Sequence, residues 1–152
     1  MMASNSLDSQ GKLLPIQIEL VESAGPVSPQ YQYDLNLNLK NHEDGLLLKY
    51  SYVGEFVYGV PEKKIVFESI LSKEKSIEWI DRLLELKPLG IQRELPDNVK
   101  NNVGISFNSL HIEIGASDKT KIMYTLGDLR RPEFANETKI IQFLKESGIK
   151  KV

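Results

Sequence analysis

The chain contains no cysteine among its 152 residues. Disulfide bonds, iron–sulfur clusters, thiolate zinc sites and cysteine nucleophiles are therefore excluded. Neither sign of charge dominates, because 19 lysines and arginines stand against 21 aspartates and glutamates, which gives a formal net charge of −2. A nucleic-acid backbone needs a concentrated positive field, so we expect no nucleic-acid partner.

Long apolar runs and catalytic signatures are also missing. No stretch approaches the roughly 20 apolar residues of a membrane-spanning helix, so we expect no membrane partner. The chain has no phosphate-binding glycine loop, Gly-x-Ser-x-Gly elbow, His-Glu-x-x-His motif or calcium loop. With only two histidines, general bases are few. We therefore predict a protein that is not an enzyme and that uses neither a cofactor nor a metal.

The first residues differ in composition from the rest. Residues 1–14 are polar and lack the basic start and apolar core of a secretory signal, which favours a cytoplasmic location. We predict that residues 1–14 form a disordered leader and that residues 15–152 form a single α+β domain.

Alternation of apolar and polar residues predicts most of the strands. It is clearest over 31–39, and it recurs over 16–20 and, with a bend at Gly54, over 46–58. A further strand is expected directly after the loop at 59–62. The remaining expected strands cover 103–107, 110–114 and 122–126.

The same alternation predicts which strand residues lie opposite each other. A four-residue loop at 41–44 would set Tyr33 opposite Tyr52 and Leu37 opposite Leu48. A second four-residue loop at 59–62 would set Phe56 opposite Ile65. A three-residue loop at 117–119 would join the strands at 110–114 and 122–126, whose even-numbered residues would face each other.

Two amphipathic helices complete the expected fold. Ser72 is suited to cap a helix that ends near Lys87, and the wide apolar face of this helix predicts Trp79 and Leu83 as core residues. Asn136 is the expected N-cap of a closing helix. Four strands, a helix, two or three strands and a helix, joined by short loops, predict a two-layer α+β domain with a mainly antiparallel sheet and both helices on one face.

Aromatic residues gather on one side of the first strands. Tyrosine hydroxyls need a polar partner, and tyrosine is enriched where one end of the side chain stays wet, so this stripe is a candidate binding surface. The alternative is that the rings lie under the edge of a helix. The members of the stripe are Tyr31, Tyr33, Tyr50, Tyr52, Phe56 and Tyr58.

Two adjacent arginines, Arg130 and Arg131, form the second candidate site. They lie in a loop over residues 128–133, and paired guanidinium groups bind phosphates and carboxylates. The alternative is internal pairing with the neighbouring acidic residues. A weaker candidate is His111 with Glu113, which project from the same side of one strand and would need a third converging group.

These features leave two hypotheses for function. The first is a non-enzymatic protein-binding module, such as an inhibitor, an immunity-type protein or an adaptor, which uses the tyrosine stripe or the 128–133 loop. The second is a small-ligand-binding or enzymatic α+β domain with a pocket between helix and sheet. We expect a protein partner, and a small ligand or a second copy of the chain remain open alternatives. Polar candidates that converge in one concave pocket would favour the second hypothesis.

Overall fold

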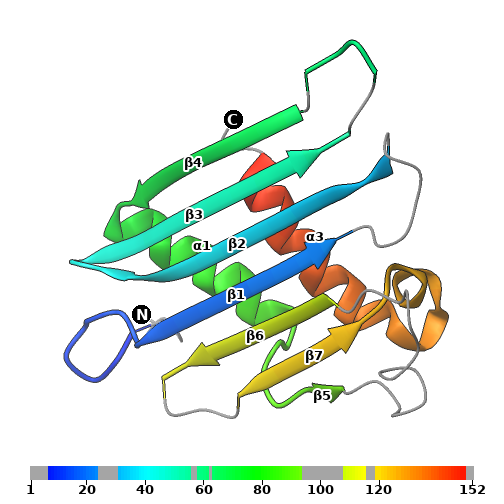
Figure 1. Ribbon diagram of the computed structural model, residues 1–152. Coiled ribbons are helices and arrows are strands. Elements are labelled where there is room, and N and C mark those ends of the chain that lie inside the picture. Colours follow the sequence, from blue (N-terminus) through cyan, green and yellow to red (C-terminus); the bar gives the residue numbers. More distant parts are fainter. Residues whose placement is uncertain are drawn as a thin grey trace.

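Figure 1 shows the computed structural model, in which one sheet is covered on one face by two helices. The structure describes residues 7–23, 31–55, 58–61, 63–93, 108–115 and 119–149. The strands are β1 (Ile16–Ser23), β2 (Tyr33–His42), β3 (Gly45–Gly54), β4 (Lys63–Leu71), β5 (Gln92–Arg93), β6 (Asn108–Ile114) and β7 (Thr120–Tyr124). The helices are α1 (Lys73–Glu85), α3 (Ala135–Ile149) and two 3₁₀ turns, η2 (Leu126–Arg130) and η3 (Pro132–Phe134).

The described strands form a single seven-stranded sheet in the order β4-β3-β2-β1-β6-β7-β5. All neighbours are antiparallel except β5 and β7. The predicted α+β class with a mainly antiparallel sheet is confirmed. The first strand lies in the middle of the sheet, because β2 pairs along one side of it and β6 along the other.

Side-chain alternation explains which face of the sheet became the core. In β1, Ile16, Ile18 and Leu20 are buried on the helix side, whereas Gln17 and Glu19 between them are exposed. Residues with the same orientation in the neighbouring strands are buried as well, and α1 and α3 cover them (Figure 1). No helix in the described part of the chain has the length and apolar character needed to cross a membrane.

The predicted register between β2 and β3 is wrong by two residues. Tyr33 was expected opposite Tyr52 and Leu37 opposite Leu48, but Tyr52 lies opposite Leu35, and the other pairs are displaced in the same way. A shift of two residues leaves every side chain on its face of the sheet. The predicted faces are therefore right although the predicted partners are not.

The turn between β2 and β3 accounts for this difference. His42 pairs with Gly45, so the loop contains only Glu43 and Asp44 instead of four residues. Glu43 adopts the left-handed backbone region with φ 53°, a conformation that glycine commonly takes in such turns. Gly45 is the first residue of β3, and only glycine fits there because a Cβ would overlap the backbone carbonyl of Leu71.

The register between β3 and β4 differs from the prediction by four residues. Phe56 was expected opposite Ile65, but β3 ends at Gly54, and Phe56 lies outside the described residues. A Cβ on Gly54 would overlap the backbone carbonyl of Gln32, so the glycine allows the chains to approach closely at the strand end. Glu55 then turns the chain away with φ 59°.

The hairpin of β6 and β7 keeps the predicted orientation with a longer connection. Leu110 lies opposite Ile122, so even-numbered residues face even-numbered ones as predicted. The predicted three-residue loop is wrong, because β6 ends at Ile114 and β7 begins at Thr120. The strand expected over residues 103–107 lies outside the described residues.

The helix boundaries follow their capping residues. The Ser72 hydroxyl accepts a hydrogen bond from the Lys75 N–H at 3.3 Å, which confirms the predicted N-cap of α1. Asn136 does not cap α3, because η3 begins at Pro132 and continues directly into a helix that starts at Ala135. Proline at the first position of such a turn has no N–H that needs a partner.

The segment before β1 contains a small turn. The carboxylate of Asp8 accepts the N–H groups of Gln10 and Lys12 at 2.8 and 3.0 Å. These bonds to Lys12 and Gln10 hold the pKa of Asp8 below its ordinary value. The first six residues of the expected leader lie outside the described residues.

Candidate functional site: the groove between the two helices

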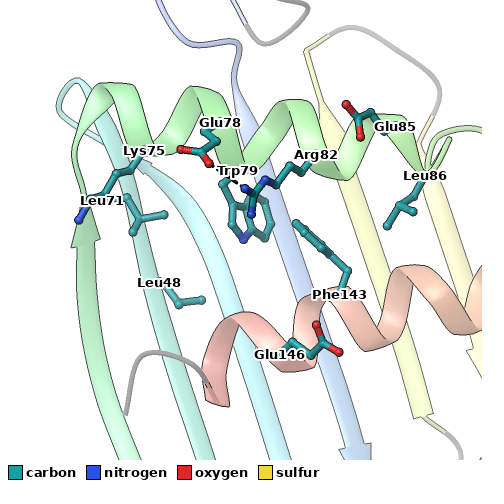
Figure 2. Close-up of a pocket in the computed structure, with 10 residues that line it drawn as sticks. All are labelled: Leu48, Leu71, Lys75, Glu78, Trp79, Arg82, Glu85, Leu86, Phe143 and Glu146. Carbon is teal, nitrogen blue, oxygen red and sulfur yellow. Dashed lines mark ion pairs between the residues drawn. The ribbon is translucent and has the colours of Figure 1, made fainter.

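A groove of about 540 Å³ opens between α1 and α3 on the helix-covered side of the sheet (Figure 2). Leu48 of β3 and Leu71 of β4 contribute the sheet side of the groove. Trp79 of α1 and Phe143 of α3 point toward each other between the helices, with ring centroids 5.3 Å apart and planes tilted by 41°. The apolar part of the groove is therefore aromatic at its centre and aliphatic on the side of the sheet.

Charged side chains of both signs surround this apolar centre. The guanidinium of Arg82 pairs with the Glu78 carboxylate at 2.9 Å, one turn apart on α1. The remaining charged residues that line the groove are Lys75, Glu85 and Glu146. A ligand that fits would bury apolar groups at the centre and present charged or polar groups at the rim.

The groove exists because the apolar face of α1 is wider than its contact with the sheet. Ile80 and Leu83 are fully buried against the sheet, which confirms the predicted core position of Leu83. Trp79 lies on the flank of this face, where it packs against the core but is only partly buried, so its prediction as a core residue holds in part. The breadth of the apolar face, about half the helix circumference, is the sequence signal that identifies this flank.

A second feature, missed in the sequence, is a buried cluster around Glu22 at the end of β1. The Glu22 side chain is fully enclosed. Its Oε2 accepts the hydroxyl of Tyr33 from β2 at 2.7 Å, and its Oε1 accepts the hydroxyl of Tyr124 from β7 at 2.7 Å. Lys145 of α3 lies 2.5 Å from Oε2. One carboxylate thus connects three strands and the last helix.

The surroundings of Glu22 keep the two tyrosines protonated. Burial is the main cause that raises the pKa of Tyr33 and the pKa of Tyr124 far above their ordinary values, and the hydrogen bonds and charge of Glu22 add to it. Both hydroxyls therefore act as donors to the carboxylate. Three donors thus contact the two oxygens of the enclosed Glu22 carboxylate.

Asn108 of β6 lies at the edge of the same region. Its Oδ1 accepts the N–H of Ser23 at 2.8 Å. Its Nδ2 is buried and has no hydrogen-bond partner among the described residues.

The predicted tyrosine stripe is divided between core and surface. Tyr50 is buried against Phe67, with ring centroids 5.3 Å apart. Tyr52 stacks on Tyr33 at 5.4 Å and donates its hydroxyl to Glu55 at 3.3 Å. The hydroxyls of Tyr33 and Tyr52 thus have hydrogen-bond partners within the protein.

The other members of the stripe are on the surface or undescribed. Tyr31 is 66% exposed and Tyr58 is fully exposed, and they lie outside the strands. Phe56 is not among the described residues. The stripe is therefore not one continuous exposed patch in the described part of the chain.

The arginine loop is paired internally in part. Arg131 contacts Glu133 at 2.6 Å and Asp128 at 3.4 Å. These hydrogen bonds, first the one to Glu133, raise the pKa of Arg131. Arg130 is exposed in the last turn of η2. The acidic neighbours thus occupy one of the two guanidinium groups that sequence reasoning assigned to a ligand.

His111 and Glu113 lie on the open face, opposite the helices. They line a shallow depression of about 170 Å³ with Gln17 and Glu19. Glu113 pairs with Lys119 at 3.5 Å. The described residues contain no group of three or more acidic or histidine side chains placed to hold a metal ion.

The predicted polar candidates therefore do not converge. Tyr33, Tyr50 and Tyr52 lie on the helix side of the sheet, and His111 lies on the opposite side. The groove is lined by none of these residues and by neither arginine of the loop.

Comparisons with protein-family models, with curated proteins and with solved structures gave no match to this chain.

Proposed function

We propose that the chain is a non-enzymatic protein-binding module whose groove between α1 and α3 takes an amphipathic helix of a partner protein. The observation that carries this proposal is the pair Trp79 and Phe143, which place aromatic surface at the centre of an open groove with a charged rim. Aromatic residues and arginine dominate the energetics of protein interfaces, and Arg82 stands beside this pair (Figure 2).

The length of the groove supports a helical partner. Its lining extends along α1 from Lys75 to the C-cap residue Leu86, a span of twelve residues or roughly 17 Å. About three turns of a partner helix cover the same distance and present apolar side chains at positions i, i+3, i+4 and i+7. The mixed charges of the rim fit a partner helix that carries both signs beside its apolar stripe.

The single tryptophan makes a direct test available. Trp79 is the only tryptophan in the chain, so its fluorescence reports on the centre of the groove alone. Amphipathic helical peptides with apolar residues at the stated spacing, selected from a displayed library against the purified protein, should shift this emission on titration. Phe143→Ala should weaken their binding by about tenfold or more.

Phe67→Ala is the matched control for this experiment. Phe67 is also a partly buried phenylalanine on the helix side of the sheet, but it does not line the groove. Peptides that bind the parent and the Phe143→Ala variant equally, or that leave the Trp79 emission unchanged, would contradict the proposal.

A small amphipathic ligand is the second candidate function, because a volume of about 540 Å³ lies within the usual range for small-molecule sites. The two candidates differ at the ends of the groove. A partner helix should lose affinity in both Lys75→Glu and Glu85→Lys, since it spans both positions. A small ligand held between Trp79 and Phe143 should respond to Phe143→Ala and be insensitive to at least one of the two charge reversals.

A further inference from the structure

Strand β4 forms one edge of the sheet described by the structure. Among the described residues, β4 pairs with β3 alone. Its nine residues contain neither proline nor glycine. On the face without helices, Val66 and Ile70 are 60% and 64% exposed. An edge strand of this length without proline can pair with a further strand, whereas the opposite edge, β5, has only two residues.

We propose that β4 pairs antiparallel with β4 of a second copy of this chain, with Val66 on the two-fold axis. A two-fold axis perpendicular to the sheet joins two identical edges as antiparallel strands and keeps both helix layers on the same side. Residues directly opposite each other then lie on the same face, so one residue of β4 must lie opposite itself.

Charge and side-chain size select the register. With Val66 on the axis, Lys64 lies opposite Glu68 of the second copy, and Ile65 lies opposite Phe67. A centre at Phe67 would place Val66 against Glu68, and a centre at Glu68 would place two carboxylates face to face. A centre at Ile65 would place Lys64 against Val66. Only the register centred on Val66 pairs opposite charges and apolar groups at once.

The charges of β4 are compatible with this pairing within one copy. The Glu68 carboxylate contacts Lys49 at 3.7 Å, and both side chains are about half exposed or more. The ammonium group of Lys63 pairs with the Glu55 carboxylate of the same copy at 3.4 Å. Glu68 thus retains accessible surface for Lys64 of the second copy.

The absence of cysteine permits a clean cross-linking test. In Val66→Cys, two opposite thiols would have Cα atoms about 4.5–5.5 Å apart, which suits a disulfide. In the matched variant Ile70→Cys, the two thiols would be eight residues apart along the strands, or roughly 27 Å. Mild oxidation should therefore give covalent dimers of the first variant and at most traces of the second, read on a non-reducing gel.

Charge reversal tests the register itself. Glu68→Lys creates two Lys–Lys contacts across the axis and should weaken dimerisation on the order of tenfold in sedimentation equilibrium. Adding Lys64→Glu restores opposite charges and should restore the dimer. The proposal is overturned if the parent sediments as a monomer up to millimolar concentration, if Ile70→Cys cross-links as readily as Val66→Cys, or if Glu68→Lys leaves the dimerisation constant unchanged.

Discussion

The two faces of the sheet are made by alternate residues of the same strands, yet one face is buried and the other is exposed to solvent. On the covered face, Ile18 and Leu20 of β1 are fully enclosed by the helix layer. On the open face, Gln17 and Glu19 of the same strand are exposed, and the hollow that they border with His111 is shallow. Whether a residue of β1 lies on the buried or on the exposed face therefore follows from its even or odd position along the strand.

The covered face is itself not uniform. Its features include a closed polar site at Glu22 and an open apolar site at Trp79. The closed site holds elements together, and the open site offers surface to a partner. The covered face thus departs from a simple hydrophobic layer at Glu22, whose charge is buried, and at Trp79, which stays partly exposed beside the groove.

The largest difference between the faces should appear at Glu22 and Glu19. Glu22→Ala leaves Lys145 without its buried counterion and two tyrosine hydroxyls without their acceptor. We expect a loss of about 3–5 kcal/mol in the free energy of unfolding. Glu19→Ala on the open face should stay within about 0.5 kcal/mol of the parent in the same urea melts. Equal effects in the two variants would contradict the comparison.

Leucine and isoleucine should show the next largest contrast. Leu83 of α1 is fully buried, so Leu83→Ala should lower the free energy of unfolding by about 2–5 kcal/mol. Ile70 is mostly exposed on the open face, and Ile70→Ala should cost no more than about 0.5 kcal/mol. Denaturant melts of both variants at equal, low protein concentration measure the difference. A Leu83→Ala effect below about 0.5 kcal/mol would show that α1 is peripheral to the fold.

A smaller effect is expected from one hydroxyl. Tyr124→Phe keeps the ring and removes only the donor to Glu22, which should cost about 1.5–3 kcal/mol because the bond is to a charged group. Tyr58→Phe is the control, since Tyr58 is fully exposed and should tolerate the change without a measurable effect. Thermal and urea unfolding that give the same result for both variants would remove the role assigned to the Tyr124 hydroxyl.

The smallest expected effect is a dependence on alkaline pH. Burial, followed by the charge of Glu22, raises the pKa of Tyr124, so the folded protein retains a proton that the unfolded chain releases near pH 10. This stabilisation is complete below about pH 10 and is lost progressively above it. Between about pH 9 and 11, the parent should lose about 1 kcal/mol more than Tyr124→Phe. Parallel curves for the two proteins would contradict this account.

The sequence predicted the faces of the strands but not their partners, for a physical reason. Burial depends on parity, and parity is unchanged when a strand slips by two or four residues. The turn at Glu43 and Asp44 decides the register between β2 and β3. In the sequence, Gly45 resembles a turn residue. In the fold, it is glycine because the carbonyl of Leu71 approaches closely, and this contact between residues distant in the sequence cannot be predicted from local pattern.

The two special positions of the covered face differ in how far the sequence predicted them. Glu22 continues the series Ile16, Ile18, Leu20 at the next even position, so extending the predicted strand past Leu20 would have placed it on the buried side. Its partners could not be predicted, because Tyr124 and Lys145 come from elements more than one hundred residues away. The groove at Trp79 depends on the distance between α1 and α3, which no local pattern encodes.

The central position of β1 has a consequence for synthesis of the chain. Strands β1 to β4 follow one another directly in the sheet, so they can associate in the order in which they are made. The other side of β1 stays without a strand until β6 is made some ninety residues later. The ammonium group of Lys145 arrives later still. During that interval one edge of β1 has no partner strand, and it ends at Glu22, an acidic residue of the kind that disfavours pairing between strand edges of different chains.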